Sequence, residues 1–76
     1  MEREVEVGKV YKHFKGIIVK IIAVAHHTER DERLVIYEHV ENHTVWARPY
    51  DMFNSLVDRE KYPSVTQKYR FERIDE

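Results

Sequence analysis

The sequence predicts a mainly β protein of short antiparallel strands with a single helical turn. Most of the 76-residue chain consists of short stretches that are rich in β-branched and aromatic residues or that alternate apolar with polar side chains. Turn signals separate these stretches, and none has the periodicity of a long helix. About five short strands, with one helical turn at residues 49–53 before the last, are typical of a small SH3-like barrel, and closing the sheet removes exposed edges.

The length limits the kind of site that this protein can build. A chain of 76 residues forms one domain, residues 1–76. A domain of this size buries only roughly 60–65% of the surface of its unfolded chain. Nearly every large apolar side chain is then needed for the core. The sequence therefore predicts a surface site, a site at the barrel mouth or a site shared between subunits, rather than a deep pocket.

Composition bears on compartment and partners. The chain has no cysteine, and its longest apolar stretch, Ile17–Ala25, is too short for a bilayer and contains Lys20. These features predict a cytoplasmic protein without a membrane partner. Thirteen basic and 14 acidic residues give a net charge of −1, which disfavours duplex DNA as a partner.

The first two strands are separated by a glycine turn. Residues 1–7 alternate valine with glutamate before Gly8 and are predicted to be a loose lead-in or an edge strand. Residues 9–14 alternate again, and Lys15-Gly16 ends them as a turn. The next strand runs from Ile17 to His26 or His27, and because it is apolar on both faces it belongs in the middle of a curved sheet.

A hairpin is predicted to join residues 33–40 to residues 43–48. A two-residue turn at Glu41-Asn42 places Tyr37 opposite Trp46. In this register, four side chains are expected to close the core, namely Val45, Ala47, Met52 and Phe53. Trp46 and Arg48 are expected to face outward beside Tyr37.

The end of the chain is less regular. Pro49 suits the first position of a helical turn that continues to Phe53. Residues 54–68 are mostly polar, with a brief strand predicted at Leu56-Val57. Residues 69–74 alternate cleanly and are predicted to form the closing strand.

Four motifs resemble those of a known family. Residues 8–16 are similar to its "GKYRHFKG", residues 27–29 to its "HSE", residues 34–37 to its "LVVY" and residues 45–53 to its "LWVRPLEMF". The family is a group of small bacterial proteins known as domain-of-unknown-function family 1653. The resemblance implies no activity. It also implies a glycine near the hairpin turn, where this chain has Glu41-Asn42-His43.

The leading functional hypothesis is a non-enzymatic binding or interaction module. Its candidate binding residues are Tyr11, Tyr37, Trp46 and Arg48, because Trp, Tyr and Arg are the types most enriched at binding hot spots. The expected partner is a protein or peptide, and a homodimer that buries the Trp46 face is another outcome. An RNA-binding barrel is an alternative, because aromatic side chains stack unpaired bases and lysines surround Tyr11.

A second alternative is a small-molecule-binding or catalytic protein. Its candidate residues are His13 and His27 as general bases, with Glu29 orienting a histidine. The structural interpretation of residues 27–29 is a turn held by side-chain-to-backbone hydrogen bonds. The sequence has no glycine-rich phosphate cradle and predicts neither a metal site nor a cofactor.

Overall fold

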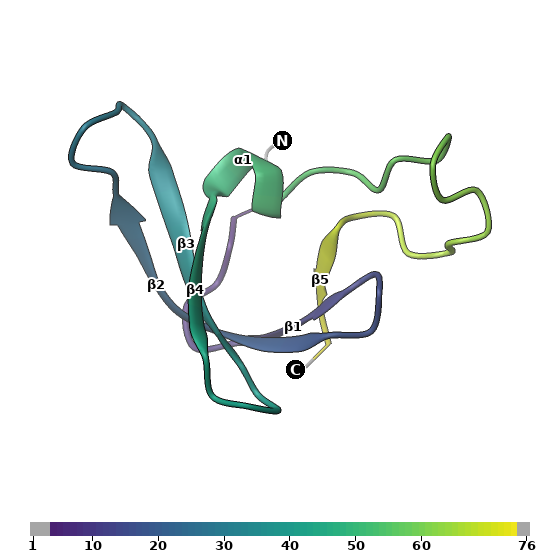
Figure 1. The fold of residues 1–76 in the computed structure, drawn as a ribbon, viewed down its shortest axis with the longest axis horizontal. Coiled ribbons are helices and arrows are strands. Elements are labelled where there is room, and N and C mark those ends of the chain that lie inside the picture. Colours follow the sequence, from purple (N-terminus) through teal and green to yellow (C-terminus); the bar gives the residue numbers. More distant parts are fainter. Residues whose placement is uncertain (1–3, 75–76) are drawn as a thin grey trace.

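A computed structural model describes residues 4–74 and shows an all-β domain with one short helix (Figure 1). The elements in chain order are β1 (Val10–His13), β2 (Ile18–His26), β3 (Arg33–His39), β4 (Val45–Pro49), α1 (Tyr50–Phe53) and β5 (Phe71–Arg73). The predicted fold class is thereby confirmed, with five antiparallel strands and a helical turn directly after Pro49. No helix within residues 4–74 has the length and apolar character needed to cross a membrane.

The five strands form one sheet that is curled but not closed. Their order is β4-β3-β2-β1-β5, and every neighbouring pair is antiparallel. β4 and β5 are therefore the two edges of the sheet. The curl still brings their side chains together, because the Arg48 guanidinium lies 5.5 Å from the centre of the Phe71 ring. The predicted closure of the barrel by backbone hydrogen bonds is absent from the described part of the chain.

β2 is the central strand, as its apolar character on both faces predicts. Its pairing with β3 shifts between Ile21 and Ala23, so that Ile22 is the extra residue of a β-bulge. Before the bulge the buried residues are Val19 and Ile21, and after it Val24 packs against the core. The inward-facing parity thus changes within the strand, which explains why the apolar run is continuous.

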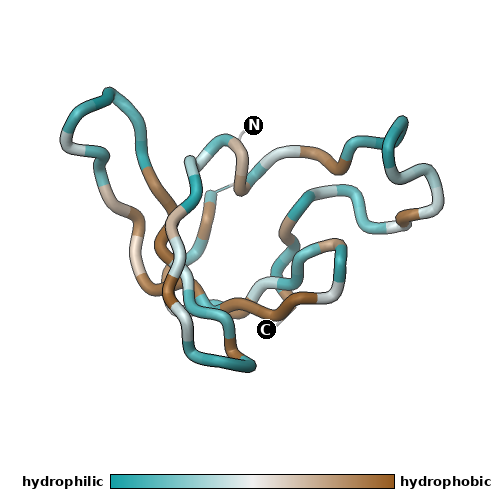
Figure 2. The backbone as a smooth tube through the Cα atoms, viewed as in Figure 1, coloured by the Kyte–Doolittle hydropathy of each residue, from teal (hydrophilic) through white to brown (hydrophobic). Residues whose placement is uncertain are grey.

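The core lies on the concave face of the sheet and is mostly aromatic. Its buried members are Val5, Tyr11, Val19, Ile21, Val35, Tyr37, Tyr50, Phe53 and Phe71. Phe53 is fully buried, and its ring stacks on Phe71 with centroids 4.1 Å apart. Tyr11 and Tyr37 contact the same Phe53 ring at 5.6 and 5.7 Å. Figure 2 shows the matching hydropathy pattern, with apolar stretches along the strands and hydrophilic residues at the β2–β3 connection.

The predicted hairpin register is confirmed, but the predicted orientation of its faces is wrong. Tyr37 pairs with Trp46, as expected. Tyr37 is buried, however, so Trp46 lies on the core-facing side of the sheet. Val45 is 61% exposed and Met52 is 49% exposed, although both were expected to close the core. Ala47 is also exposed.

The physical reason is that register fixes which residues pair and not which face is buried. Phe53 is in the core as predicted, whereas Tyr50 takes the place expected for Met52. The Tyr50 ring also packs under the Arg33 guanidinium, 3.8 Å from its centre. Val35 and Tyr37 on one face of β3 are buried, whereas Ile36 and Glu38 on the other face are only partly buried. The first face is the one that packs against Phe53 and Phe71.

The hairpin loop has four residues rather than two. The His43 N–H donates to the His39 carbonyl at 2.8 Å, and the His39 N–H donates to the Thr44 carbonyl at 2.8 Å. Residue His43, rather than Asn42, adopts the left-handed backbone conformation, with φ of 60°. The predicted two-residue loop and the observed four-residue loop have the same centre, between Glu41 and Asn42. Both therefore give the same register, and the pairing was predicted correctly from a different loop.

The N-terminal lead-in is tied to the core by two tyrosine hydroxyls. Within residues 4–7 there is no strand, and residues 1–3 lie outside the described part of the chain. The buried Val5 N–H donates to the Tyr50 hydroxyl at 2.9 Å, and that hydroxyl donates to Glu4 Oε2 at 3.3 Å. The Glu6 N–H donates to the Tyr11 hydroxyl at 3.1 Å. Tyr50 thus links the lead-in to the end of β4.

We expect Tyr50→Phe to lower the free energy of unfolding by about 1–3 kcal/mol, because the buried Val5 N–H loses its acceptor. Urea denaturation measures this change. Tyr62→Phe is the matched control, since within residues 4–74 its hydroxyl has no hydrogen-bond partner in the structure, and it should cost less than half as much. Equal stability of Tyr50→Phe and the wild type would contradict a stabilising role for the hydrogen bond from Val5 to Tyr50.

The segment of residues 54–70 leaves the sheet and returns to it, as Figure 1 shows. Leu56 and Tyr69 form a single β-bridge where a brief strand was predicted. The Val57 N–H donates to the Lys68 carbonyl, and Val57 is buried. The Gln67 side-chain amide donates to the Lys12 carbonyl at 2.8 Å. These contacts hold the segment against β1. The closing strand β5 has three residues, Phe71–Arg73, where residues 69–74 were predicted.

Candidate functional site

A hollow of about 310 Å³ opens on the concave face, between β4 and the strands β1 and β5. We call it the concave hollow. Its lining residues are His13, Lys15, Ile17, Tyr37, His39, Trp46, Arg48 and Phe71. Another hollow, of about 400 Å³, lies beside α1, but carboxylates and basic groups share its lining and none of the predicted site residues is there. The concave hollow combines apolar rings with uncompensated positive charge, which is the pattern of a binding site.

A ladder of aromatic rings forms one wall of the concave hollow. The Tyr37 and His39 rings are stacked with centroids 6.0 Å apart and an interplanar angle of 17°. His39 is in turn stacked on Trp46, at 5.4 Å and 28°. Tyr37 and His39 are two residues apart on β3 and therefore share a face, while Trp46 comes from β4. The three stacked rings form a flat surface, with the buried Tyr37 at one end and the exposed Trp46 at the other.

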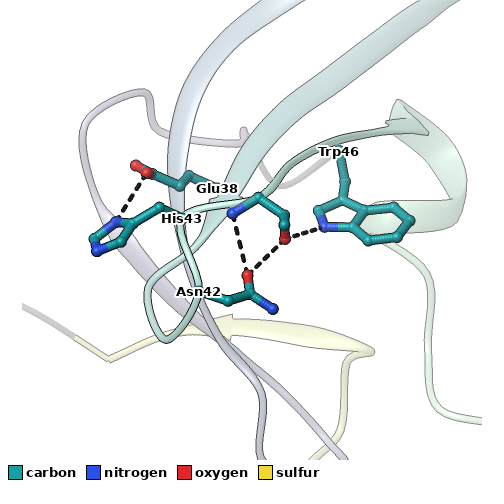
Figure 3. Close-up of polar contacts among 5 residues, drawn as sticks. Glu38, Asn42, His43 and Trp46 are labelled. Atoms are coloured by element: carbon teal, nitrogen blue, oxygen red, sulfur yellow. Dashed lines mark hydrogen bonds and ion pairs between the residues drawn. The ribbon is translucent and has the colours of Figure 1, made fainter.

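The Trp46 side chain is held in place by the hairpin loop (Figure 3). Its indole N–H donates to Thr44 Oγ1 at 2.7 Å, and that hydroxyl donates to Asn42 Oδ1 at 2.6 Å. The same Asn42 oxygen accepts the Thr44 backbone N–H at 3.1 Å. Trp46 is 52% exposed despite these bonds. A large ring that is fixed and yet half exposed loses little side-chain entropy on binding.

Arg48 lies in the hollow without an acidic partner. Its Nε–H donates to the Tyr37 hydroxyl at 3.4 Å, and its guanidinium faces the Phe71 ring. Among residues 4–74, no carboxylate lies within ion-pair distance of this guanidinium. Lys15 lines the same hollow. The hollow therefore has a positive potential that a bound anion would neutralise.

A basic hollow, of about 360 Å³, adjoins the concave hollow and shares His13, Lys15 and Arg48 with it. It adds further cations and a single carboxylate to the surface, from Lys61, Arg70 and Asp58. The Nε atom of Arg70 is buried and has no hydrogen-bond partner among the described residues. The two hollows together form a continuous basic surface in a protein whose net charge is only −1.

His13 sits where the two hollows meet. Its Nδ1 accepts the Lys15 backbone N–H at 3.1 Å, so in the neutral ring the hydrogen is on Nε2. Its ring stacks on Phe14 and meets the edge of Phe71. Burial, followed by the positive charges of Arg48, Arg70 and Lys15 and by His39, lowers the pKa of His13 from 6.5 to about 4. Burial first, and then the basic surface, thus keep the His13 ring neutral well below pH 6.5.

We expect His13 to make stability depend on pH between about 6.5 and about 4. In this window the unfolded chain binds a proton that the folded protein does not, so the free energy of unfolding falls as the pH falls and levels off below about 4. Because His13 is only partly buried, solvent screening reduces the effect to on the order of 1 kcal/mol. His13→Asn should remove this contribution, since the Asn oxygen can accept the same N–H without titrating.

The comparison is made by thermal melts of both proteins at a series of pH values. The stability of wild type relative to His13→Asn should fall through the window. His27→Asn is the matched control, because the His27 Nδ1 accepts the Glu29 backbone N–H at 3.0 Å in a turn outside the concave hollow. A constant difference between wild type and His13→Asn from pH 7 to pH 4 would contradict the lowered pKa.

The structure does not bring the candidate catalytic residues together at one site. His27 and Glu29 are joined through the Glu29 backbone N–H, which confirms the interpretation of these residues as a bonded turn. Neither residue lines the concave hollow, whereas His13 does. Within residues 4–74, no three His, Cys, Asp or Glu side chains come close enough to hold a metal ion.

Three of the four candidate binding residues line the concave hollow: Tyr37, Trp46 and Arg48. The fourth, Tyr11, is buried in the core with its hydroxyl on the lead-in. The sequence prediction did not assign His13 or Phe71 to the binding surface. Phe71 reaches the concave hollow only because β5 pairs with β1, and no local pattern in the sequence encodes that pairing.

Comparison with known proteins gives one match. The sequence profile of a family described as "Protein of unknown function (DUF1653)" matches residues 9–73, which is most of the chain. No curated protein and no solved structure matches the chain. The family match covers all five strands, α1 and every residue that lines the concave hollow.

Proposed function

The chain belongs to the DUF1653 family, whose description assigns no function, and on this premise we propose that it is a non-enzymatic binding module. Its working surface is the concave hollow, and its partner is a protein or a peptide. The observation that carries the proposal is the position of Arg48, a half-buried cation among aromatic rings with no carboxylate in ion-pair distance among the described residues. A group of this kind is costly unless a partner neutralises it.

The residue types and their geometry support a binding surface. Trp, Tyr and Arg dominate binding hot spots, and here Trp46, Tyr37 and Arg48 converge from adjacent strands. The Thr44 hydroxyl fixes the Trp46 ring before any partner arrives. Catalysis has less support, because no side-chain acid–base pair faces the hollow within the described residues.

The proposal is tested by affinity capture from an extract of the cells that make the protein, with wild type and Trp46→Ala compared side by side. A partner that binds wild type and not Trp46→Ala is the expected result. Met52→Ala is the matched control, since Met52 is about as exposed as Trp46 and does not line the concave hollow. Thermal melts of both variants report whether the fold is intact. Capture of the same partners by all three proteins would refute the proposal.

A further inference from the structure

The outer edge of β4 has backbone groups that point away from the sheet. The His39 N–H donates to Thr44, and hydrogen-bonded pairs recur at every second residue of an antiparallel ladder. The register makes Tyr37 and Trp46 the next such pair. The N–H and C=O groups of Val45 and Ala47 therefore point to the open edge, where no described strand lies beside them.

This edge is exposed and has a defined length. Val45 is 61% exposed, and Ala47 is exposed as well. Pro49 is the next residue whose N–H would point outward, and proline has none. Pro49 thus ends the edge. Arg48 is the one charged residue of β4, and its side chain lies in the concave hollow and leaves the outward backbone groups of Val45 and Ala47 uncovered. The available edge runs from Val45 to Arg48.

The open edge and the concave hollow meet on the same strand. Trp46 and Arg48 send their side chains into the hollow, while the backbone of Val45 and Ala47 faces outward. A peptide strand that pairs with β4 would direct every second side chain to the concave side, beside Trp46 and Arg48. Lys15 and Arg48 line that side, and Arg70 lies in the adjoining hollow. Acidic side chains are the complementary choice.

We infer that the β4 edge accepts an extended acidic peptide as an added strand, and that its alternate side chains enter the concave hollow. This inference rests on the proposed function and names the class of partner. A peptide fits better than single-stranded RNA, because only a peptide can use the backbone groups of Val45 and Ala47 in a regular ladder. The aromatic wall of Tyr37, His39 and Trp46 then contacts the peptide side chains that enter the concave hollow.

Two synthetic peptides test the charge preference, Ac-Ser-Glu-Val-Glu-Val-Glu-Ser-NH2 and its counterpart with lysine in place of each glutamate. Isothermal titration calorimetry should show that the acidic peptide binds at least roughly tenfold more tightly than the lysine peptide. Oligouridylate of six nucleotides is the third probe. Equal affinity of the two peptides, no peptide binding up to about 1 mM, or oligouridylate binding more tightly than the acidic peptide would each overturn the inference.

Backbone methylation tests the added strand itself. Methylation of one alternate set of amide nitrogens in the acidic peptide should lower its affinity by roughly tenfold or more, and methylation of the other set should leave it within about twofold. On the protein, Ala47→Pro removes an outward N–H without removing a hydrogen bond to β3. This variant should therefore weaken binding of the acidic peptide as much as the disruptive methylated set does. If Ala47→Pro fails to fold, the methylated peptides decide. Equal sensitivity to both methylated sets overturns the inference.

The outcomes separate this inference from the proposed function. A captured partner that depends on Trp46, together with no binding of the acidic peptide, overturns the added strand and leaves the binding module standing. Sedimentation of the protein alone is the last arm. A dimer that dissociates in Ala47→Pro would make a second copy of this chain the occupant of the β4 edge and would overturn the acidic peptide.

Discussion

Phe53→Ala is expected to unfold the protein. The Phe53 side chain is fully buried and contacts three other rings of the core, those of Tyr11, Tyr37 and Phe71. Truncating a buried phenylalanine costs about 3–5 kcal/mol. A domain of this size is stable by only roughly 5 kcal/mol, so the loss is close to the whole margin. Circular dichroism during a thermal melt measures the result, and we expect little or no cooperative transition.

Met52→Ala is the matched control, because Met52 precedes Phe53 in the same helical turn. Met52 is 49% exposed, and its truncation should cost less than about 1 kcal/mol. The pair of variants separates the contribution of the core from the helical propensity of α1. A cooperative melt of Phe53→Ala within a few degrees of Met52→Ala would contradict the position of Phe53 at the centre of the core.

Arg48→Met is expected to weaken partner binding strongly with little change in the melting temperature. Methionine keeps the apolar stem of Arg48 against the Phe71 ring, and it removes a charge that has no carboxylate in ion-pair distance within residues 4–74. The free energy of unfolding should change by less than about 1 kcal/mol, because the lost hydrogen bond to the Tyr37 hydroxyl is long, at 3.4 Å, and removal of the unpaired charge offsets it. Affinity for the captured partner should fall by roughly tenfold or more, because hydrogen bonds to a charged group are the strong ones.

His13 provides an independent measurement on the same variant. The positive charge of Arg48 is the second cause of the lowered His13 pKa, after burial, so Arg48→Met should raise that pKa toward 6.5. NMR titration of the His13 ring measures it. Arg33→Met is the matched control, since Arg33 also packs on an aromatic ring but outside the concave hollow. A lower melting temperature for Arg48→Met with unchanged binding would show that Arg48 serves the fold alone.

The strands and the pairing of the hairpin strands β3 and β4 could be predicted because short-range patterns determine them. The apolar run of residues 17–25 predicted the central strand, and the hairpin of residues 33–48 was predicted with the correct register. The buried face of the hairpin was predicted incorrectly because the register fixes which residues pair and does not fix which face is buried. Only the packing of α1 and β5 against the concave face selects which of the two faces is buried.

The binding residues could be predicted in part, because residue type and position on the strand suffice for some of them. Tyr37, Trp46 and Arg48 follow from the hairpin register alone. His13 and Phe71 come from β1 and β5, which meet this surface only through the curl of the whole sheet. The absence of a carboxylate near Arg48 within the described residues is likewise a property of the tertiary structure. The basic surface could not be inferred from a net charge of −1.

Trp46 allows the most direct test of the concave hollow as the working surface. It is the only tryptophan of the chain and is half exposed at the rim, so its fluorescence reports on this surface alone. Titration with the captured partner, or with a tryptophan-free fragment of it, should shift the emission to shorter wavelength and saturate with the binding curve. In Arg48→Met the shift should need a partner concentration that is higher by roughly tenfold or more. Saturable binding that leaves the Trp46 emission unchanged would place the working surface elsewhere and contradict the account.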